Sequence, residues 1–203
     1  MLKSLLSRSL IAGLALSILA PTFAEARTYR IFDPSSRKMM TVDTSKNRKS
    51  GRTVAKEFHR TVVAFATTEA PGTVIIDSAS RHLYFVLPGE MAIRFGVGVG
   101  RDGFRWGGVH KITAKKEWPD WTPPSQMLAR RPDLPRHMKG GVDNPLGARA
   151  MYLGSTLYRI HGSNEPETIG QAVSSGCFRM TNDDVTDLYS RVAVGTTVVV
   201  LNN

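Results

Sequence analysis

The chain has 203 residues, a formal net charge of +10 at pH 7 and a single cysteine. The length fits one domain with a hydrophobic core, and one cysteine excludes an intrachain disulfide. The positive charge is concentrated near the N-terminus, because residues 27–60 hold ten Lys and Arg against three acidic residues, whereas residues 61–203 are close to neutral.

The first 26 residues have the pattern of a secretory signal peptide. A positively charged start precedes an apolar run over residues 10–20, which is too short to span a bilayer, and Ala24-Glu25-Ala26 fits a cleavage site. We expect cleavage after Ala26 and export to the periplasm, with no stable membrane span in the mature protein. An uncleaved membrane anchor is the alternative.

Residues 27–71 predict a flexible, basic N-terminal arm. The run over residues 45–52 is rich in Lys, Arg and Ser, and the whole segment holds few large apolar residues. Such an arm is attracted to anionic surfaces, and an exported protein meets the cell wall and anionic lipid rather than nucleic acid. A linker that only solvates the chain is the other interpretation.

Strand patterns dominate from residue 72 onward. β-Branched and aromatic residues bounded by turn residues predict strands, the first two of which form a hairpin. The predicted strands cover residues 73–77, 83–87, 91–99, 109–115, 146–153, 156–161 and 196–201. A short helix is predicted over residues 125–131, and a second one starts near Thr181 and ends near Gly195. We therefore predict a mainly β domain of the sandwich or barrel type over residues 72–203, with one or two short helices.

A glycine-rich stretch matches a dinucleotide-binding fingerprint by its letters alone. Residues 98–103 read Gly-Val-Gly-Arg-Asp-Gly, but the Phe-Arg-Trp-Gly-Gly of residues 104–108 cannot open the helix that a bound phosphate needs. No βαβ unit surrounds them either. We therefore reject a nucleotide site here.

Two tryptophans lie in a long irregular stretch between the predicted strands. Trp118 and Trp121 stand among prolines in residues 117–124, and residues 132–145 form a further loop. Long loops in compact domains are commonly functional. We expect this segment to be either a lid over a site or a packed cover over the sheet.

Cys177 and His161 are the candidate catalytic pair. Cys177 follows Ser174-Ser175-Gly176, whose composition indicates an exposed turn, and it precedes the second predicted helix. A thiol reacts as the thiolate, which a neighbouring imidazole and the positive end of a helix both favour. His161 stands at the end of a predicted strand, sixteen positions upstream. A buried, inert cysteine is the alternative.

Taken together, these motifs resemble the L,D-transpeptidase catalytic domain family, also called the YkuD domain family, over about residues 73–201. The resemblance rests on His161-Gly162, the turn Ser174-x-Gly176-Cys177-x-Arg179, the helix after it and the ending Gly195-Thr196-Thr197-Val198. It implies a β-sandwich-like fold and an exported enzyme that acts on peptidoglycan stem peptides. The family's commonest motif reads Ser-His-Gly-Cys, whereas Ser175 stands here in place of that histidine.

The resemblance also implies roles for the matched residues. Cys177 would attack the diaminopimelate carbonyl linked to D-alanine and form an acyl-enzyme, and His161 would act as general base and acid. The Gly162 carbonyl would orient the imidazole, and Arg179 would help to hold the substrate. The amide groups of Gly176 and Cys177 are our candidates for stabilising the oxyanion. Further substrate-binding candidates are Ser174, Ser175, Tyr158, Trp118 and Trp121.

The acceptor that resolves the acyl-enzyme stays open at the level of sequence. A second stem peptide would give a cross-link, the amine of an outer-membrane protein would attach that protein to the wall, and water would give an L,D-carboxypeptidase or endopeptidase. A wall-binding module without catalysis is the alternative from another class. We expect no metal and no cofactor, since the five histidines show no ligand spacing.

Overall fold

The computed structural model describes residues 28–33, 38–43 and 53–202, the first two ranges by their backbone alone. The chain divides into two compact units, residues 1–49 and 50–203. In the first unit, β1 (Thr28–Asp33) pairs with β2 (Lys38–Asp43) in an antiparallel ladder. The predicted signal peptide and the basic run over residues 45–52 lie outside the described residues.

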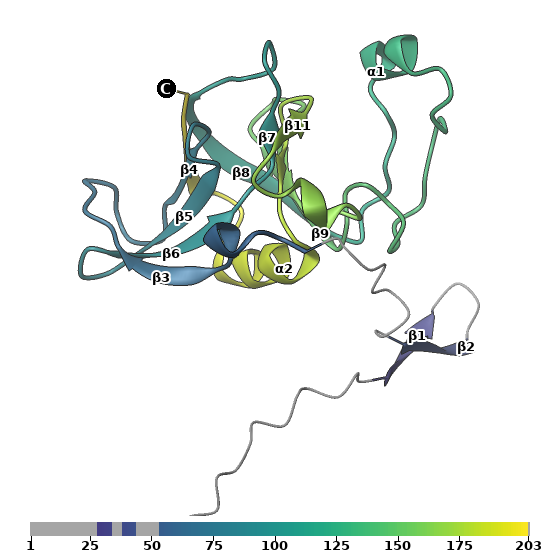
Figure 1. The fold of residues 1–203 in the computed structure, drawn as a ribbon, viewed down its shortest axis with the longest axis horizontal. Coiled ribbons are helices and arrows are strands. Elements are labelled where there is room, and N and C mark those ends of the chain that lie inside the picture. Colours follow the sequence, from purple (N-terminus) through teal and green to yellow (C-terminus); the bar gives the residue numbers. More distant parts are fainter. Residues whose placement is uncertain (1–27, 34–37, 44–52, 203) are drawn as a thin grey trace, which may run out of the picture. The chain divides into compact units, whose positions relative to one another are not determined.

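A sheet of nine strands forms the frame of the second unit (Figure 1). Its strand order is β12-β10-β9-β8-β13-β4-β5-β6-β3. Along the chain these strands are β3 (Thr61–Ala64), β4 (Val74–Asp77), β5 (His82–Leu87), β6 (Met91–Gly96), β8 (Gly108–Glu117), β9 (Arg149–Leu153), β10 (Arg159–His161), β12 (Phe178–Arg179) and β13 (Thr197–Leu201). A separate parallel pair joins β7 (Val99–Gly100) to β11 (Ala172–Ser174).

Short helices complete the described elements of this unit. They are the 3₁₀ helices η1 (Lys56–Phe58) and η2 (Pro166–Thr168) and the α-helices α1 (Ser125–Arg130) and α2 (Asn182–Arg191). The predicted start of α2 is confirmed, because the Thr181 hydroxyl accepts a hydrogen bond from the Asp184 amide at 3.1 Å. No helix of the described residues is long and apolar enough to cross a membrane.

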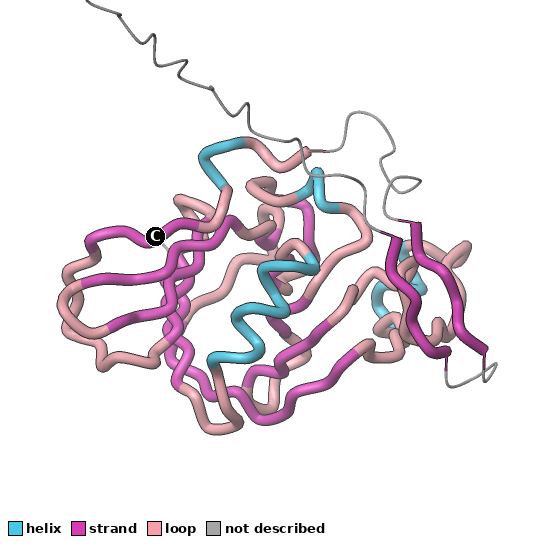
Figure 2. Tube along the Cα trace, turned by 90° about the horizontal axis from the view of Figure 1, so that it is seen from below, coloured by secondary structure: helices cyan, strands magenta, loops and turns pink. Residues whose placement is uncertain are grey.

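Strand β8 bends the sheet around a single core. Its first half pairs with β13 and its second half with β9, and the register shifts between Ile112 and Ala114. A shift of this kind bends a strand and increases its twist. Buried side chains from both halves of the sheet, such as Phe95, Met151 and Phe178, meet in one cluster, which also includes Val185 and Leu188 of α2. Figure 2 shows the path of α2 beside the strands. The prediction of a mainly β fold with two short helices is confirmed.

Several predicted boundaries are corrected by tertiary contacts. The hairpin is confirmed as β4 and β5, but the strand predicted over residues 91–99 ends at Gly96. Phe58 packs there so closely that a Cβ on Gly96 would lie 2.4 Å from it. The second helix ends at Arg191 rather than near Gly195. At this end of the helix, the Lys115 ammonium donates hydrogen bonds to two carbonyl oxygens.

The strands that lead into the site are shorter than predicted. β9 begins at Arg149 and not at residue 146, because Gly147 adopts a left-handed conformation and the Asn182 side chain holds the Ala148 amide at 2.9 Å. β10 begins at Arg159 and not at residue 156, since a turn closed by side-chain hydrogen bonds precedes it. Both differences come from turns that local strand propensity does not register.

Strand β3 and helix η1 lie in the segment for which the sequence predicted a flexible arm. β3 pairs with β6 at the edge of the sheet, and Phe58 also packs against Gly170. Arg60 forms ion pairs with two carboxylates of α2, at 3.6 and 3.3 Å. Residues 53–71 therefore belong with the second unit, and the predicted boundary between residues 71 and 72 lies too late in the chain.

Candidate active site

Strands β10 and β12 bring the candidate residues together. They are parallel neighbours, with His161 opposite Arg179. Side chains alternate between the two faces of a strand, so Arg159 lies on the same face as His161. By the same alternation, Cys177 lies on the same face as Arg179. The strand pairing thus gathers a thiol, an imidazole and two guanidinium groups on one face.

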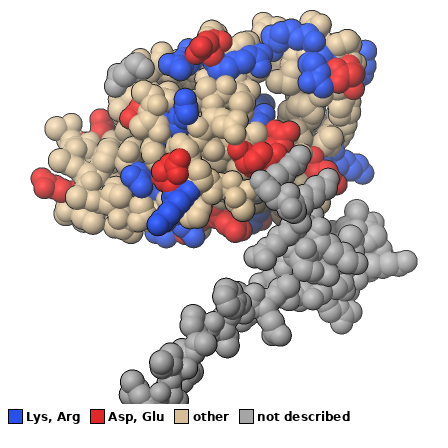
Figure 3. Space-filling view, in the orientation of Figure 1, with Lys and Arg blue, Asp and Glu red and all other residues tan. Residues whose placement is uncertain are grey.

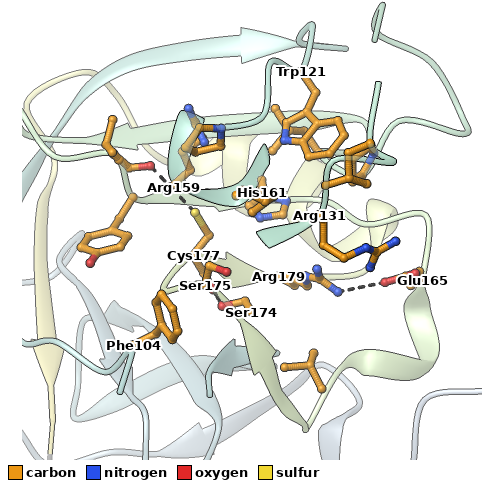
Figure 4. Close-up of a pocket in the computed structure, with 18 of the residues that line it drawn as sticks. Phe104, Trp121, Arg131, Arg159, His161, Glu165, Ser174, Ser175, Cys177 and Arg179 are labelled. Atoms are coloured by element: carbon orange, nitrogen blue, oxygen red, sulfur yellow. Dashed lines mark hydrogen bonds and ion pairs between the residues drawn. The ribbon is translucent and has the colours of Figure 1, made fainter. Parts of the chain in front are cut away.

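This face borders a pocket of about 920 Å³ (Figure 4). Figure 4 shows the His161 ring and the Cys177 side chain in the same part of the pocket, with Arg159 and Arg179 beside them. Another wall comes from α1 and its flanking loops, which include Trp121. The predicted pair therefore shares one cavity.

His161 is held as a neutral base. The residue is 4% exposed, and its Nδ1 atom lies 2.6 Å from the carbonyl oxygen of Gly162. Because a carbonyl oxygen only accepts, Nδ1 carries the proton and Nε2 keeps the lone pair. Burial and, to a smaller extent, the positive charge of Arg179 lower the pKa of His161 to about 3, although the hydrogen bond to Gly162 opposes both effects. The imidazole is thus uncharged at neutral pH.

The thiol of Cys177 is neutral as well in the resting site. Burial raises the pKa of Cys177, and the positive charges of Arg159 and Arg179 act against that rise. Its Sγ atom lies 3.9 Å from the carbonyl oxygen of Leu157. The sequence led us to expect a thiolate held by the imidazole. The structure instead gives a neutral pair. At the thiol, the effect of burial outweighs that of the arginines, and at the imidazole burial and the charge of Arg179 both disfavour the protonated form.

The turn before Cys177 is fixed by the Ser174 hydroxyl. This hydroxyl donates to the carbonyl oxygen of Cys177 at 2.6 Å and accepts from the Gly176 amide at 3.1 Å. The Gly176 amide is therefore engaged and cannot serve as an oxyanion donor in this conformation, contrary to the sequence-based expectation. The Cys177 amide has no hydrogen-bond partner in the described part of the chain. Ser174 borders the pocket, but its hydroxyl has a structural role, whereas Ser175 borders the pocket without such a bond.

The remaining predicted residues divide between the pocket and the outside. Tyr158 and Trp121 line the pocket. Trp118 does not line the pocket. It follows β8 with a φ of 41°, and 42% of its surface is exposed. None of the residues of α1 is buried, so this part of the segment is not a packed cover over the sheet. Whether it moves as a lid stays a prediction.

Arg179, for which a structural ion pair was the alternative to a substrate contact, does form an ion pair. Its guanidinium lies 3.0 Å from a carboxylate oxygen of Glu165 across the pocket (Figure 4). Arg159 was missed, although its spacing of two residues from His161 on a strand is a signal for a shared face. Its Nε atom is buried and makes no hydrogen bond among the described residues. Both arginines are therefore candidates for contacts with a ligand.

The pocket is basic. Its lining includes Arg101, Arg130, Arg131, Arg159 and Arg179, against the acidic residues Asp143 and Glu165. Figure 3 shows Lys and Arg side chains gathered over the segment that carries α1. An anionic ligand fits this charge balance. No group of His, Cys, Asp or Glu side chains that could hold a metal ion occurs among the described residues.

A thiol and an orientated imidazole in one pocket of a mainly β domain define a candidate cysteine-nucleophile site. Residues 71–200 match the family model described as the L,D-transpeptidase catalytic domain, YkuD. The matched region covers more than half of the chain. The chain therefore belongs to the L,D-transpeptidase catalytic domain family.

Similar proteins agree with this assignment. "Probable L,D-transpeptidase ErfK/SrfK" of Escherichia coli K12 is 36% identical over 138 residues, which cover 64% of this chain and 44% of that protein. "Probable L,D-transpeptidase YbiS" of the same strain is 38% identical over 134 residues, which cover 62% and 43%. The match thus spans less than half the length of either relative.

Solved structures share the fold at low sequence identity. An L,D-transpeptidase from Mycobacterium smegmatis superposes with a TM-score of 0.52 at 19% identity, over 64% of this chain and 58% of that one. L,D-transpeptidase 3 from Mycobacterium tuberculosis gives a TM-score of 0.53 at 14% identity, over 64% and 60%. These likenesses support the fold.

Proposed function

We propose that this protein is a periplasmic L,D-transpeptidase that moves an acyl group from a peptidoglycan stem peptide to an amine, through a thioester on Cys177. The observation that carries the proposal is the shared face of Cys177, His161, Arg159 and Arg179, in a chain of this family. Export rests on the signal-peptide pattern of the first 26 residues.

In the first half-reaction, His161 removes the thiol proton as the sulfur of Cys177 attacks the carbonyl carbon between diaminopimelate and D-alanine. The carbon–nitrogen bond of that amide then breaks. The imidazolium returns its proton to the leaving nitrogen, and D-alanine departs, which leaves a thioester on the enzyme. The neutral imidazole has a lone pair free to accept this proton, but the lowered pKa of His161 and the raised pKa of Cys177 make the transfer costly before a substrate enters the site.

In the second half-reaction, an acceptor amine attacks the thioester carbonyl. It gives a proton to His161, the carbon–sulfur bond breaks, and the thiolate of Cys177 takes the proton back. The arginines have a simple part in both steps. Arg159 and Arg179 lower the cost of negative charge on the sulfur, and the basic pocket matches the free carboxylates of stem peptides.

The test is the fate of peptidoglycan. The chain from residue 27 is incubated with purified sacculi that carry tetrapeptide stems, and the muropeptides and free D-alanine are measured by mass spectrometry. We expect D-alanine release together with new cross-linked dimers, and neither product with Cys177→Ala. A matched control, Thr113→Ala on the exposed part of β8, should keep both products.

Other outcomes contradict the proposal in defined ways. Shortened monomers without dimers would make the protein a hydrolase, with water as the acceptor. A new amide between a stem peptide and an added outer-membrane protein would change the acceptor while keeping the thioester. Binding to sacculi with no release of D-alanine would leave a wall-binding module and remove the catalytic proposal.

A further inference from the structure

The loop between β7 and β8 contacts the nucleophile turn directly. The indole N–H of Trp106 donates to the carbonyl oxygen of Gly176 at 2.7 Å, across 70 positions of sequence. Trp106 lies just after the glycine-rich residues 98–103, which the sequence analysis rejected as a nucleotide site. Its side chain is not part of the pocket lining. It therefore reaches the turn from behind the site.

The Trp106 ring is itself held in place. It stacks on Tyr158 with ring centroids 4.5 Å apart and planes 11° apart, and it also contacts Phe178 and His110. Such stacked and edge contacts fix the position of an indole more firmly than area burial alone. The donor that points at Gly176 is thus part of a rigid aromatic cluster.

Gly176 fits tightly against this cluster. It has φ +107°, and a Cβ at this position would lie 2.3 Å from the Tyr158 ring. The turn is consequently bounded by Tyr158 and by two hydrogen bonds, one from Trp106 to the Gly176 carbonyl and one from the Gly176 amide to Ser174. Little freedom remains for the peptide group between Gly176 and Cys177.

The direction of that peptide group has a chemical consequence. A trans peptide is planar, so its N–H points opposite to its C=O. When Trp106 holds the Gly176 carbonyl, the Cys177 amide must point to the side away from Trp106. That amide has no partner in the described part of the chain, and Cys177 itself lines the pocket. An N–H fixed beside the attacking sulfur is what a developing oxyanion requires.

We propose that Trp106 is a positioning residue for acyl transfer: its hydrogen bond to the Gly176 carbonyl sets the Cys177 amide as the oxyanion donor. The role rests on the proposed function, because only a reaction at a carbonyl forms an oxyanion. Trp106 touches no substrate. It acts through the peptide plane of the turn, and its loss weakens stabilisation of the tetrahedral intermediate while the thiol keeps its place.

The test compares two reactions of the same sulfur. In the first, the thiolate of Cys177 attacks p-nitrophenyl acetate, p-nitrophenolate leaves and an acetyl thioester forms, so the reaction passes through an oxyanion. In the second, the thiolate displaces iodide from iodoacetamide, and no oxyanion forms. Both reactions are followed in wild type, Trp106→Phe and the matched variant Trp118→Phe, whose tryptophan lies outside the pocket.

We expect Trp106→Phe to slow acylation about tenfold, less than the hundredfold or more for complete loss of an oxyanion donor, because the amide is loosened and not removed. Alkylation should keep the wild-type rate, and Trp118→Phe should change neither reaction. Replacement of Trp106 by 3-benzothienylalanine, which keeps the bicyclic ring and lacks the N–H, should reproduce the effect if the phenylalanine variant folds poorly. A parallel fall in both rates, or no fall in acylation, overturns the proposal.

This experiment is independent of the natural substrate. The ester probe contains no peptidoglycan, so failure to release D-alanine from sacculi would overturn the proposed function and leave the two reaction rates interpretable. Conversely, an active transpeptidase whose acylation is unaffected in both Trp106 variants would keep the function and remove the role of Trp106.

Discussion

The Nδ1 atom of His161 lies 2.6 Å from the carbonyl oxygen of Gly162, the next residue in the chain. This contact fixes one tautomer and leaves Nε2 as the basic nitrogen. The ring is almost fully buried, so the same arrangement that makes His161 a neutral base also makes protonation costly in the folded state. Acid should therefore act on stability through this residue.

Replacement of His161 by Gln should reduce the acid sensitivity of the fold. The unfolded chain takes up this proton below about pH 6.5, whereas the native pKa is lowered to about 3, so His161 costs no stability above pH 6.5 and an increasing amount as the pH falls toward 3. Between pH 7 and pH 5, wild type should lose about 2 kcal/mol more than His161→Gln in urea unfolding. The exposed-site control His59→Gln should lose as much as wild type. Equal losses in wild type and His161→Gln would contradict the buried neutral histidine.

Replacement of Arg159 by Gln should make the thiol less reactive. Burial raises the pKa of Cys177, and Arg159 is the first of the groups that oppose the rise. Without this charge the pKa of Cys177 should rise further, and iodoacetamide labelling at pH 8 should slow by roughly 3- to 10-fold. Arg105→Gln, on an exposed arginine outside the pocket, is the matched control. Labelling of Arg159→Gln at or above the wild-type rate would refute this electrostatic role.

Replacement of Gly176 by Ala should damage both the fold and the site. Alanine is unfavourable here for two reasons. The backbone has a left-handed φ of +107°, and the added Cβ would lie 2.3 Å from the Tyr158 ring. Gly103→Ala separates them, because Gly103 has φ +79° and open space around it. We expect about 1 kcal/mol of lost stability for Gly103→Ala and clearly more for Gly176→Ala. Thermal or urea unfolding measures the difference, and similar losses would show that the contact with Tyr158 relaxes freely.

The candidate pair of Cys177 and His161 could be predicted from local sequence, but its surroundings could not. A lone cysteine after Ser-Ser-Gly and a histidine at a strand end are visible as patterns. The parallel pairing of β10 with β12 is not, and this pairing is what puts Arg159 and Arg179 on the same face as the thiol. The contact between Trp106 and Gly176 joins residues 70 positions apart, and no periodicity signals it.

The fold shows the same division between local and distant signals. The β4–β5 hairpin and the Thr181 cap depend on neighbouring residues, and both follow from the sequence. The edge strand β3 was missed although it reads Thr-Val-Val-Ala, because this short β-branched run stands next to a strongly basic segment and its partner β6 is distant in sequence. Composition favoured an arm where tertiary contacts make a strand.

Phe58 gives the last prediction, since it anchors the segment that the sequence assigned to the arm. Its side chain fills the space beside Gly96 and Gly170, where glycine leaves room for the ring. Phe58→Ala should therefore destabilise the protein by about 2 kcal/mol, which is below the roughly 3 to 5 kcal/mol for a fully buried aromatic side chain because Phe58 is only half-buried. Val62→Ala, at a residue that is 57% exposed on β3, should cost little. Urea unfolding compares these two variants. In a second comparison, a chain that starts at Gly72 should be less stable than one that starts at Thr53. Equal stability of these two chains would show that residues 53–71 are a dispensable arm after all.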